Sequence, residues 1–321
     1  MCDTGAGRGR DAALRSLLVC PGCGGTLVWD VRAARCPASG HAYPITDGVP
    51  LLLADVAHDE HKARQADFFD AEDAQFERTR PHGAPAMYGW LLHEKFARAT
   101  VAIAGTLRGA TAVASCGGSG MDAEFLARAG ARVISVDLSL GAARGARARA
   151  ARYGLAILSV VGDAERLPIA TEGVGVAYVH DGLHHLADPY VGLRELTRVA
   201  RRAVSVTEPC RAALTRVAVR AGLAYDEEEA GNRVGRMELD RIRGEFSAAG
   251  FDTVHAERYG MFYRQHPGRP MHACSRRRVR PLAERAVLAA NRVGGHLGNK
   301  LTVQAVRVGT SRRGDPGGRA L

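Results

Sequence analysis

Lysine, aromatic residues and long apolar runs are scarce in this chain. Only three of its 44 basic residues are lysine, and the other 41 are arginine. Aromatic residues make up 6% of the chain, and no apolar run reaches the roughly 18 residues that a bilayer-spanning helix needs. The polar start, residues 1–5, does not have the pattern of a signal peptide. We therefore expect a soluble, cytoplasmic protein with no membrane partner.

The net charge of +10 would suit a nucleic-acid partner. However, many arginines lie in Ala-rich segments such as 144–152, where we favour a solvated basic face over a phosphate-binding stripe. Proteins that bind single strands combine basic side chains with aromatic ones, and the sequence shows no such stripe. Nucleic acid is therefore the less favoured partner.

The seven cysteines are an odd number, and three of them cluster near the N-terminus. In a cytosolic protein this favours metal or free thiols over disulfides. Cys20-Pro-Gly-Cys23 places two thiolates on one side of a turn, and Cys36 with His41 would complete a tetrahedral zinc site. Ser39 stands where a second Cys-x₂-Cys pair would end. The alternative is therefore a ribbon that has kept its shape without a metal.

The composition divides the chain into a small N-terminal part and one large domain. We expect a disordered start and a zinc-ribbon-like domain in 1–57, and a helical connector or lid in 58–100. The main domain would occupy 101–310, and a disordered tail 311–321.

Apolar runs and helix-prone segments alternate through the main domain. This alternation predicts an α/β fold with a Rossmann-like, seven-stranded, mostly parallel sheet and helices on both faces. The expected strands are 111–115, 132–137, 157–161, 174–180, 203–207, 253–259 and 301–308. The expected helices are 88–107, 122–129, 140–153, 190–200 and 238–249. We expect a surface loop in 265–280, which is rich in Pro, His and Arg.

A nucleoside site is predicted where the first strand of this domain ends. The segment Cys116-Gly-Gly-Ser-Gly120 follows that strand and precedes a helix, and Asp137 ends the next strand. Glycines let the backbone approach a ligand closely, because no Cβ is in the way. An acid at the end of the second strand can accept hydrogen bonds from both hydroxyls of a ribose.

Two further segments carry a family resemblance. Val161-Gly-Asp-Ala-Glu-Arg-Leu-Pro168 follows the third strand, and Val179-His-Asp-Gly-Leu-His-His-Leu186 follows the fourth. Together with the glycine turn and Asp137, they resemble class I S-adenosylmethionine-dependent methyltransferases of the small-molecule, quinone-methylase-like type. The cysteine segment resembles the zinc-ribbon-like domain that activates or accompanies many methyltransferases.

The resemblance implies a binding site for S-adenosyl-L-methionine. Asp137 would hold the ribose, Asp163 the adenine amino group, and His180 would lie near the sulfonium. The full set of expected cofactor-binding residues is Cys116, Gly117, Gly118, Gly120, Asp137, Leu138, Asp163, Ala164 and His180. The sequence departs from the family pattern at Ala114, where an acid is usual, and at Cys116, which replaces a glycine.

A general base is needed only if the methyl acceptor must lose a proton. His180 or Asp181 would serve, since both follow the fourth strand at the edge where ligands bind. Alternatively, Asp181 caps the next helix. We favour packing for the His184-His185 pair, and we expect the Glu208 carboxylate to face the mouth of the pocket.

Three functions remain open. The leading one is methyl transfer to a small-molecule acceptor, in keeping with the resemblance. The second is a ribosomal RNA methyltransferase with an N-terminal zinc ribbon, which has a similar layout. The third is a non-enzymatic module with a decayed cofactor site, suggested by Ala114 and Cys116.

Overall fold

The computed structural model describes residues 11–54, 59–71, 80–210, 237–261 and 267–309. The ends predicted to be disordered, 1–10 and 311–321, lie outside these ranges. Within them, no helix combines the length and the apolar character needed to cross a membrane.

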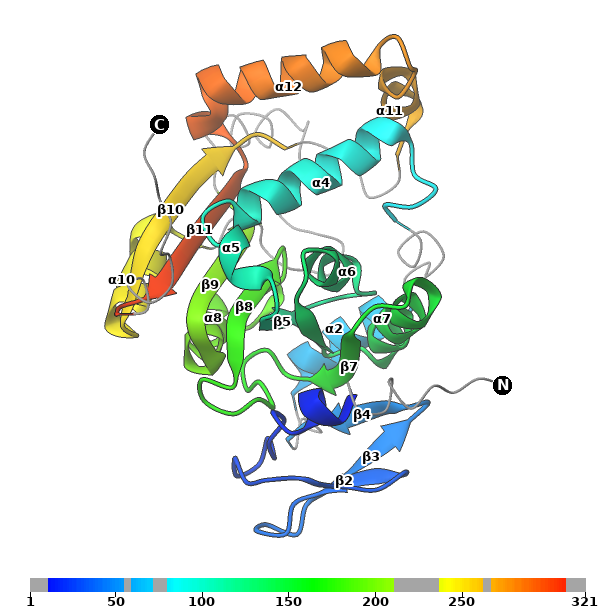
Figure 1. Ribbon diagram of the computed structural model, residues 1–321, viewed down its shortest axis with the longest axis vertical. Coiled ribbons are helices and arrows are strands. Elements are labelled where there is room, and N and C mark those ends of the chain that lie inside the picture. The colour runs from blue at the N-terminus through cyan, green and yellow to red at the C-terminus, as the bar shows by residue number, and fades with distance from the viewer. Residues whose placement is uncertain (1–10, 55–58, 72–79, 211–236, 262–266, 310–321) are drawn as a thin grey trace.

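Eleven strands of the described residues form one sheet, in the order β1-β2-β3-β4-β7-β6-β5-β8-β9-β11-β10 (Figure 1). The seven strands predicted for the main domain are all present, and five of them are parallel. They are β5 (Thr111–Ser115), β6 (Arg132–Asp137), β7 (Ile157–Gly162), β8 (Val174–His180), β9 (Ala200–Pro209), β10 (Phe251–Tyr259) and β11 (Lys300–Arg307). The antiparallel strand β11 pairs with both β9 and β10.

The strand order reverses beside β5. The chain runs from β5 to β6 and β7 on one side, then crosses to β8 and β9 on the other. In open α/β sheets, ligands bind at such a switch point, outside the carboxyl ends of the strands. The predicted glycine turn after β5 and the His180-Asp181 pair at the end of β8 therefore lie side by side at this edge of the sheet.

Helices cover both faces of this sheet, and local signals set their ends. Helix α7 (Leu140–Tyr153) begins after Ser139, whose hydroxyl accepts the Ala142 N–H, and ends at the left-handed Gly154. The other predicted helices correspond to α4 (Ala86–Thr100), α6 (Met121–Arg128), α8 (Pro189–Val199) and α10 (Leu239–Ala248). The predicted helix 88–107 is wrong in extent: the structure has α4, a turn, and a short α5 (Ala104–Leu107).

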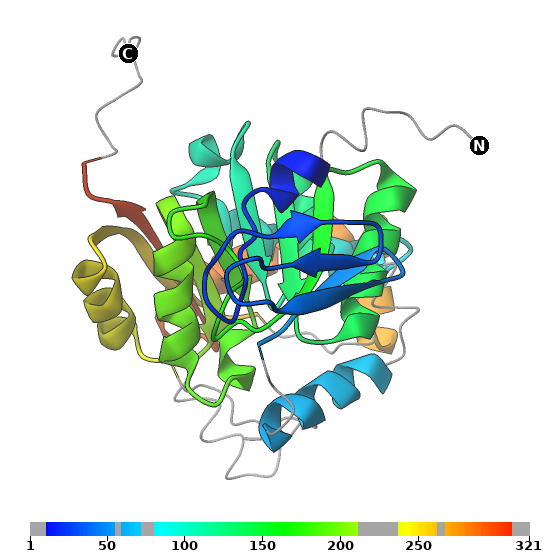
Figure 2. The same cartoon turned by 90° about the horizontal axis from the view of Figure 1, so that it is seen from below.

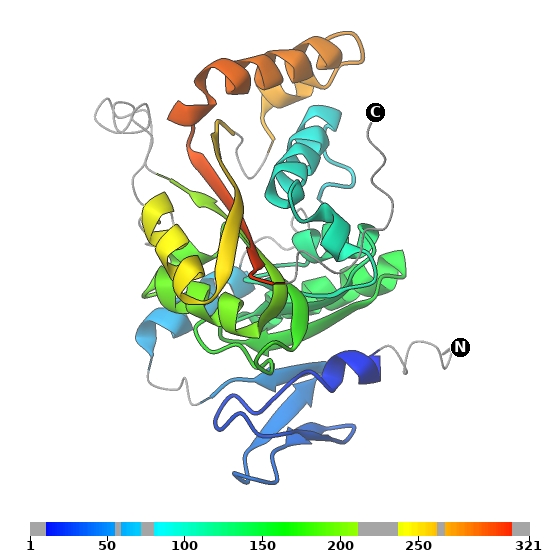
Figure 3. The ribbon, with the colours of Figure 1, turned by 60° about the vertical axis from the view of Figure 1, so that its left-hand side comes forward.

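The predicted surface loop 265–280 is also wrong. Within its described part the chain forms helix α11 (Arg269–Cys274), and the unpredicted helix α12 (Arg280–Gly294) follows. Each of these helices has a proline in its first turn, where the missing N–H costs no hydrogen bond and the fixed φ suits a helix. These prolines therefore mark helix starts. Figure 3 shows α12 at one end of the molecule and the N-terminal strands at the other.

The N-terminal strands extend the main sheet. They are β1 (Val28–Trp29), β2 (Ala33–Arg35), β3 (Ala42–Thr46) and β4 (Val49–Leu52). Strand β4 pairs in parallel with β7 through Leu51 opposite Val161 and Leu52 opposite Gly162. The N-terminal segment therefore covers what would otherwise be an open edge of the sheet, with unpaired backbone groups.

Helix α2 (Glu60–Ala71) follows these strands and packs near the start of α7. The Asp70 carboxylate accepts hydrogen bonds from the Ser139 hydroxyl and, at 2.7 Å, from the Gly141 N–H. In Figure 2, the N-terminal strands lie in front of the main domain, and α2 lies at the lower edge of the picture. The connector thus contacts the loop that follows Asp137.

Candidate active site

The turn after β5 has the backbone shape that its glycines predict. Cys116, Gly118 and Gly120 have φ values of 51°, 51° and 83°, in the left-handed region. A Cβ on Gly117 would lie 2.3 Å from the Ser135 hydroxyl, so only glycine fits there without a shift. Cys116 adopts positive φ despite its side chain, which is uncommon away from Asn and Asp.

Asp137 lies beside this turn, at the end of β6. Its Oδ2 accepts the Gly118 N–H at 2.8 Å, and its Oδ1 accepts the Ser139 N–H at 2.9 Å. Burial raises the pKa of this carboxyl above its usual value, although the two backbone N–H groups oppose the shift. The structure thus places Asp137, the residue predicted to bind the ribose, in direct contact with the predicted glycine turn. Leu138, the next residue, is half-buried.

Asp163 follows β7, where its side chain meets an unforeseen partner. Lys62 of α2 donates to Asp163 Oδ2 at 2.6 Å and lies 2.6 Å from Glu165 Oε2. Burial would lower the pKa of Lys62, but the hydrogen bonds to the two carboxylates outweigh it and raise the pKa. Ala164 sits between the two acids. Sequence reasoning missed Lys62, because its partners lie about a hundred residues away.

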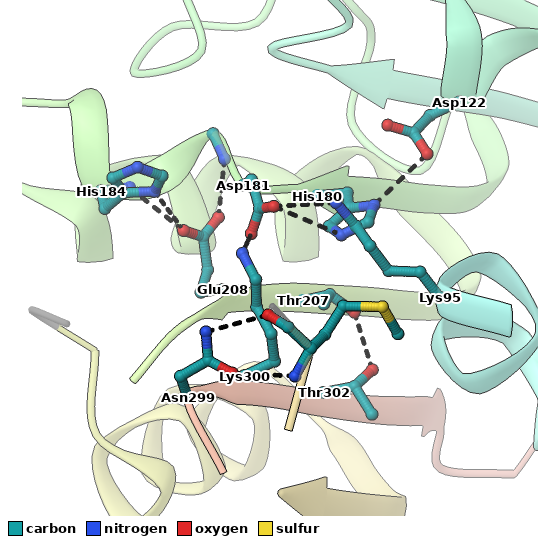
Figure 4. Close-up of polar contacts among 12 residues, drawn as sticks. Lys95, Asp122, His180, Asp181, His184, Thr207, Glu208, Asn299, Lys300 and Thr302 are labelled. Carbon is teal, nitrogen blue, oxygen red and sulfur yellow. Dashed lines mark hydrogen bonds and ion pairs between the residues drawn. The ribbon is translucent and has the colours of Figure 1, made fainter. Parts of the chain in front are cut away.

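Asp181 is held between two lysines at the end of β8 (Figure 4). Lys300 Nζ lies 2.5 Å from Oδ1, and Lys95 Nζ lies 2.9 Å from Oδ2. Burial would raise the pKa of Asp181, but the two ammonium groups hold it well below its usual value. Such a carboxylate is a poor proton acceptor. The capping alternative is wrong, because Asp188 caps α8 by accepting the Tyr190 N–H at 3.0 Å.

His180 lies beside Asp181, with only 2% of its side chain exposed. Its Nδ1 is 3.3 Å from Oδ1 of Asp122, the second residue of α6. Its Nε2 is 3.6 Å from Asp181 Oδ2 and makes no hydrogen bond within the described part of the chain (Figure 4). Burial, helped by the nearby Lys95, lowers the pKa of this imidazole below its usual value. The ring is therefore neutral near pH 7.

Glu208 is fully buried, so the expectation that it faces a pocket mouth is wrong. Its carboxylate accepts the N–H groups of Gly182 at 3.0 Å and Leu183 at 2.8 Å, and it lies 2.7 Å from His184 Nδ1. It thereby fixes the short helix turn Leu183–His185 that follows Asp181. The predicted packing role is confirmed for His184, which is 1% exposed.

Arg149 of α7 contradicts the expectation of a fully solvated basic face. It is fully buried, and its Nη1 lies 2.7 Å from Glu124 Oε2. Its Nε also donates to the Ser119 carbonyl at 2.9 Å, inside the glycine turn. A buried pair of this kind needs further hydrogen bonds to offset its desolvation, and this contact supplies one. Arg149 therefore stabilises the glycine turn through the Ser119 carbonyl.

The three clustered cysteines converge in the N-terminal segment. The Sγ atoms of Cys20, Cys23 and Cys36 all lie within 4.8 Å of one another. His41 Nδ1 lies 3.6 Å from Cys20 Sγ and 2.9 Å from the Ser39 hydroxyl, so it borders the group on the Cys20 side. The Tyr43 hydroxyl, 3.0 Å from Cys20 Sγ, is a further neighbour.

Direct hydrogen bonds join this segment to the loop that carries Asp163. Arg166 donates to the Gly22 carbonyl at 2.7 Å, within the Cys20–Cys23 turn. The Val19 N–H donates to the Pro168 carbonyl at 3.0 Å. The cysteine turn and the loop after β7 therefore hold each other in place.

The family of the chain follows from comparison with known proteins. Residues 113–205 match the model of a methyltransferase domain, and residues 11–48 match that of Trm112p-like proteins. The chain therefore carries a methyltransferase domain, preceded by a Trm112-like domain. Both matches fall where the glycine turn and the cysteine cluster lie.

A solved structure agrees with this chain on the fold. Magnesium protoporphyrin IX methyltransferase from Synechocystis PCC 6803, crystallised with bound SAH, is 16% identical with a TM-score of 0.51. The similarity covers 77% of this methyltransferase and 100% of that chain. At this identity the likeness extends to the fold alone.

Two short curated proteins match a small part of the methyltransferase. The UPF0434 protein of Janthinobacterium sp. (strain Marseille) is 49% identical over 51 residues, which is 15% of this chain and 85% of that protein. The UPF0434 protein of Paraburkholderia phymatum is 52% identical over 50 residues, 15% of this chain and 73% of that protein. Over this stretch the methyltransferase belongs to their family.

Proposed function

We propose that this methyltransferase methylates a small-molecule acceptor, with His180 as the general base. One observation carries the proposal. His180 is a buried, neutral imidazole with Nδ1 beside Asp122 and an Nε2 that makes no hydrogen bond in the described chain. A carboxylate at Nδ1 favours the tautomer whose Nε2 lone pair can accept a proton.

The cofactor would lie along the glycine turn. In this arrangement Asp137 accepts hydrogen bonds from the ribose hydroxyls, and Asp163 accepts one from the adenine amino group. Leu138 and Ala164 lie beside the adenine. Each carboxylate oxygen can accept more than one hydrogen bond, so the contacts already made by Asp137 and Asp163 leave capacity for a ligand. Cys116, Gly117, Gly118 and Gly120 would border the methionine part.

The cofactor supplies the activated methyl group, so the protein must align the acceptor and exclude water. When the acceptor is a hydroxyl, thiol or ammonium, its proton must leave before or during transfer. His180 can take that proton on Nε2. Asp181 cannot compete for it, because Lys95 and Lys300 stabilise its ionised form. Its role is to hold the two lysines, which come from α4 and β11.

The pairing of charges favours a small acceptor over RNA. Lys95 and Lys300 both form ion pairs with Asp181, and Lys62 forms ion pairs with Asp163 and Glu165. A site that binds a phosphate backbone offers cations to the ligand, and loses affinity steeply as salt rises. Here the lysines at the sheet edge are paired with carboxylates of the protein.

The second candidate, RNA methylation, is favoured by a different region. Three arginines between α11 and α12 and the first residue of α12 are all exposed: Arg276, Arg277, Arg278 and Arg280. Of these, only Arg280 has an ion pair in the described residues, with Glu284 at 3.1 Å. Such a run suits a polyanion.

We also propose that the cysteine cluster binds structural zinc. Three thiols within 4.8 Å provide three of the four ligands of a tetrahedral site. His41 is the proposed fourth ligand, because it lies at the edge of the group and needs only a small approach. The Tyr43 hydroxyl would then hydrogen-bond the Cys20 thiolate and hold it in place.

Incubation with methyl-labelled S-adenosylmethionine tests the proposed acceptor class. Purified protein would be supplied with a cell extract separated into a small-molecule fraction and an RNA fraction. We expect label in small molecules, and its loss in His180→Asn. Label in the RNA fraction alone would overturn the small-molecule assignment. No calorimetric binding of S-adenosylhomocysteine at high micromolar concentration would remove the cofactor assignment as well.

A further inference from the structure

The amino-acid end of the cofactor carries an ammonium group that needs an acceptor. The residues at the end of β5, Ala114, Ser115 and Cys116, offer no carboxylate for it. Asp137 accepts hydrogen bonds from two backbone N–H groups, and in the proposed arrangement it also binds the ribose. Asp122, immediately beyond the glycine turn, is the other acid that borders the turn.

The Asp122 carboxylate is used on one oxygen and open on the other. Its Oδ1 lies 3.3 Å from His180 Nδ1 and 3.4 Å from the Tyr178 hydroxyl. Its Oδ2 accepts no hydrogen bond from any residue that the structure describes. The side chain is 18% exposed, so a ligand that lies along the glycine turn can reach the open oxygen.

This carboxylate is ionised. Burial would raise the pKa of Asp122, but His180, Lys95 and Arg80 outweigh burial and lower it. An ionised oxygen that no described protein group pairs with requires a cation or another hydrogen-bond donor from outside the chain. A cationic donor next to the glycine turn would meet that requirement.

We propose that Asp122 binds the α-ammonium group of S-adenosylmethionine through Oδ2. The inference rests on the proposed function, because it assumes that the cofactor occupies the glycine turn. Asp122 follows Gly120 by two residues, so the turn that borders the methionine part also delivers the carboxylate. The same side chain then contacts the cofactor on one oxygen and the base His180 on the other.

Two ligands that differ only at the amino-acid end test this role. S-adenosylhomocysteine carries the ammonium, whereas 5′-methylthioadenosine has the same nucleoside thioether without it. Calorimetry on the full chain would measure both ligands against wild type and Asp122→Asn. We expect the variant to lose about 10- to 100-fold in affinity for S-adenosylhomocysteine, as for a charge-assisted hydrogen bond. Its affinity for 5′-methylthioadenosine should be unchanged.

Asp240→Asn is the matched control. Asp240 also lies in the first turn of a helix, α10, but its side chain is 97% exposed. This variant should bind both ligands as wild type does. A second variant, His180→Asn, removes the Oδ1 partner and should keep the preference for S-adenosylhomocysteine over 5′-methylthioadenosine.

The outcomes separate this role from the proposed function. Equal losses for both ligands in Asp122→Asn would mean a general disturbance of the site and would overturn the inference. Unchanged binding of S-adenosylhomocysteine would overturn it too. If wild type binds neither ligand, the cofactor assignment itself fails, and that result is visible before any variant is made.

Discussion

The cysteine cluster and the acid–base cluster around His180 are built in opposite ways. The cysteine cluster comes from one short stretch, Cys20 to Cys36, in which turns bring the thiols within 4.8 Å. The His180 cluster draws Lys95 from α4, Asp122 from α6 and Lys300 from β11. Local turns can be inferred from sequence spacing, whereas contacts across two hundred residues depend on how the sheet is assembled.

The lysines show the same contrast. All three in the chain pair with carboxylates at the sheet edge, and their side chains are 17%, 5% and 12% exposed at Lys62, Lys95 and Lys300. A chain with 41 arginines has lysine only there. A compact ammonium can approach a single carboxylate oxygen where the planar guanidinium fork would need more room. The scarcity was visible in the sequence, but its meaning was not.

Of the changes to the His180 cluster, replacement of His180 with asparagine should have the largest effect on the rate. Loss of a general base costs about 10²- to 10⁴-fold in turnover. Binding of S-adenosylhomocysteine should persist, because the cofactor contacts proposed for the turn remain. Steady-state rates with an identified acceptor, together with calorimetry, would measure both. Turnover within twofold of wild type would remove His180 from the mechanism.

Glu208→Ala should destabilise the turn that follows Asp181, next to the His180 cluster. It leaves the N–H groups of Gly182 and Leu183 and the His184 ring without their buried acceptor. We expect a loss of about 3–5 kcal/mol in the free energy of unfolding, measured by denaturant titration. Glu172→Ala, at a half-exposed side chain, is the control and should cost under about 1 kcal/mol. A similar small loss in both variants would contradict the structural role of Glu208.

Metal removal should destabilise the cysteine cluster. Chelation, or Cys23→Ser, should lower Tm by about 2–4 °C for each kcal/mol of binding energy that is lost. It should also weaken cofactor binding, because Arg166 joins the cysteine turn to the loop after Asp163. Cys274→Ser, outside the cluster, is the matched control. Metal analysis that finds no zinc in wild type, or a Tm that the chelator leaves unchanged, would count against the zinc site.

The pH dependence of the rate should report His180. Burial lowers its pKa below the usual value of a histidine, and the base works only when unprotonated. The rate should therefore be at its plateau near pH 7 and fall as pH drops, with the midpoint below the ordinary histidine value of about 6.5. A rate profile on the acid side would show this limb, and His180→Asn should lack it. A midpoint above 6.5 would mean that another group limits the reaction.

The smallest effect is expected at Lys62, where the connector meets the site. Lys62→Met removes the ammonium that bridges Asp163 and Glu165, and so loosens the loop proposed to bind adenine. We expect S-adenosylhomocysteine to bind about five-fold more weakly, equivalent to roughly 1 kcal/mol. Arg64→Met, exposed on the same helix, should leave affinity unchanged. Tighter binding in Lys62→Met would instead mean that Lys62 competes with the cofactor.

Much of the fold was predictable from local pattern. The apolar runs of β5 to β9 are buried on both faces, and such runs separated by capped helices indicate a parallel sheet. Helix α7 ends at Gly154 as predicted. The prediction failed at 265–280, because Pro270 and Pro281 start helices there, and a proline is compatible both with a loop and with a first helical turn.

The sequence by itself determined which residues follow each strand, and hence that the glycine turn, Asp137 and His180 lie at one edge of the sheet. Spacing also determined that three cysteines can meet. Only the tertiary structure decided the protonation chemistry: it placed Lys95 and Lys300 on Asp181 and Asp122 on His180. The pKa of a buried group depends on charges within a few ångströms, and those charges come from segments that are distant along the chain.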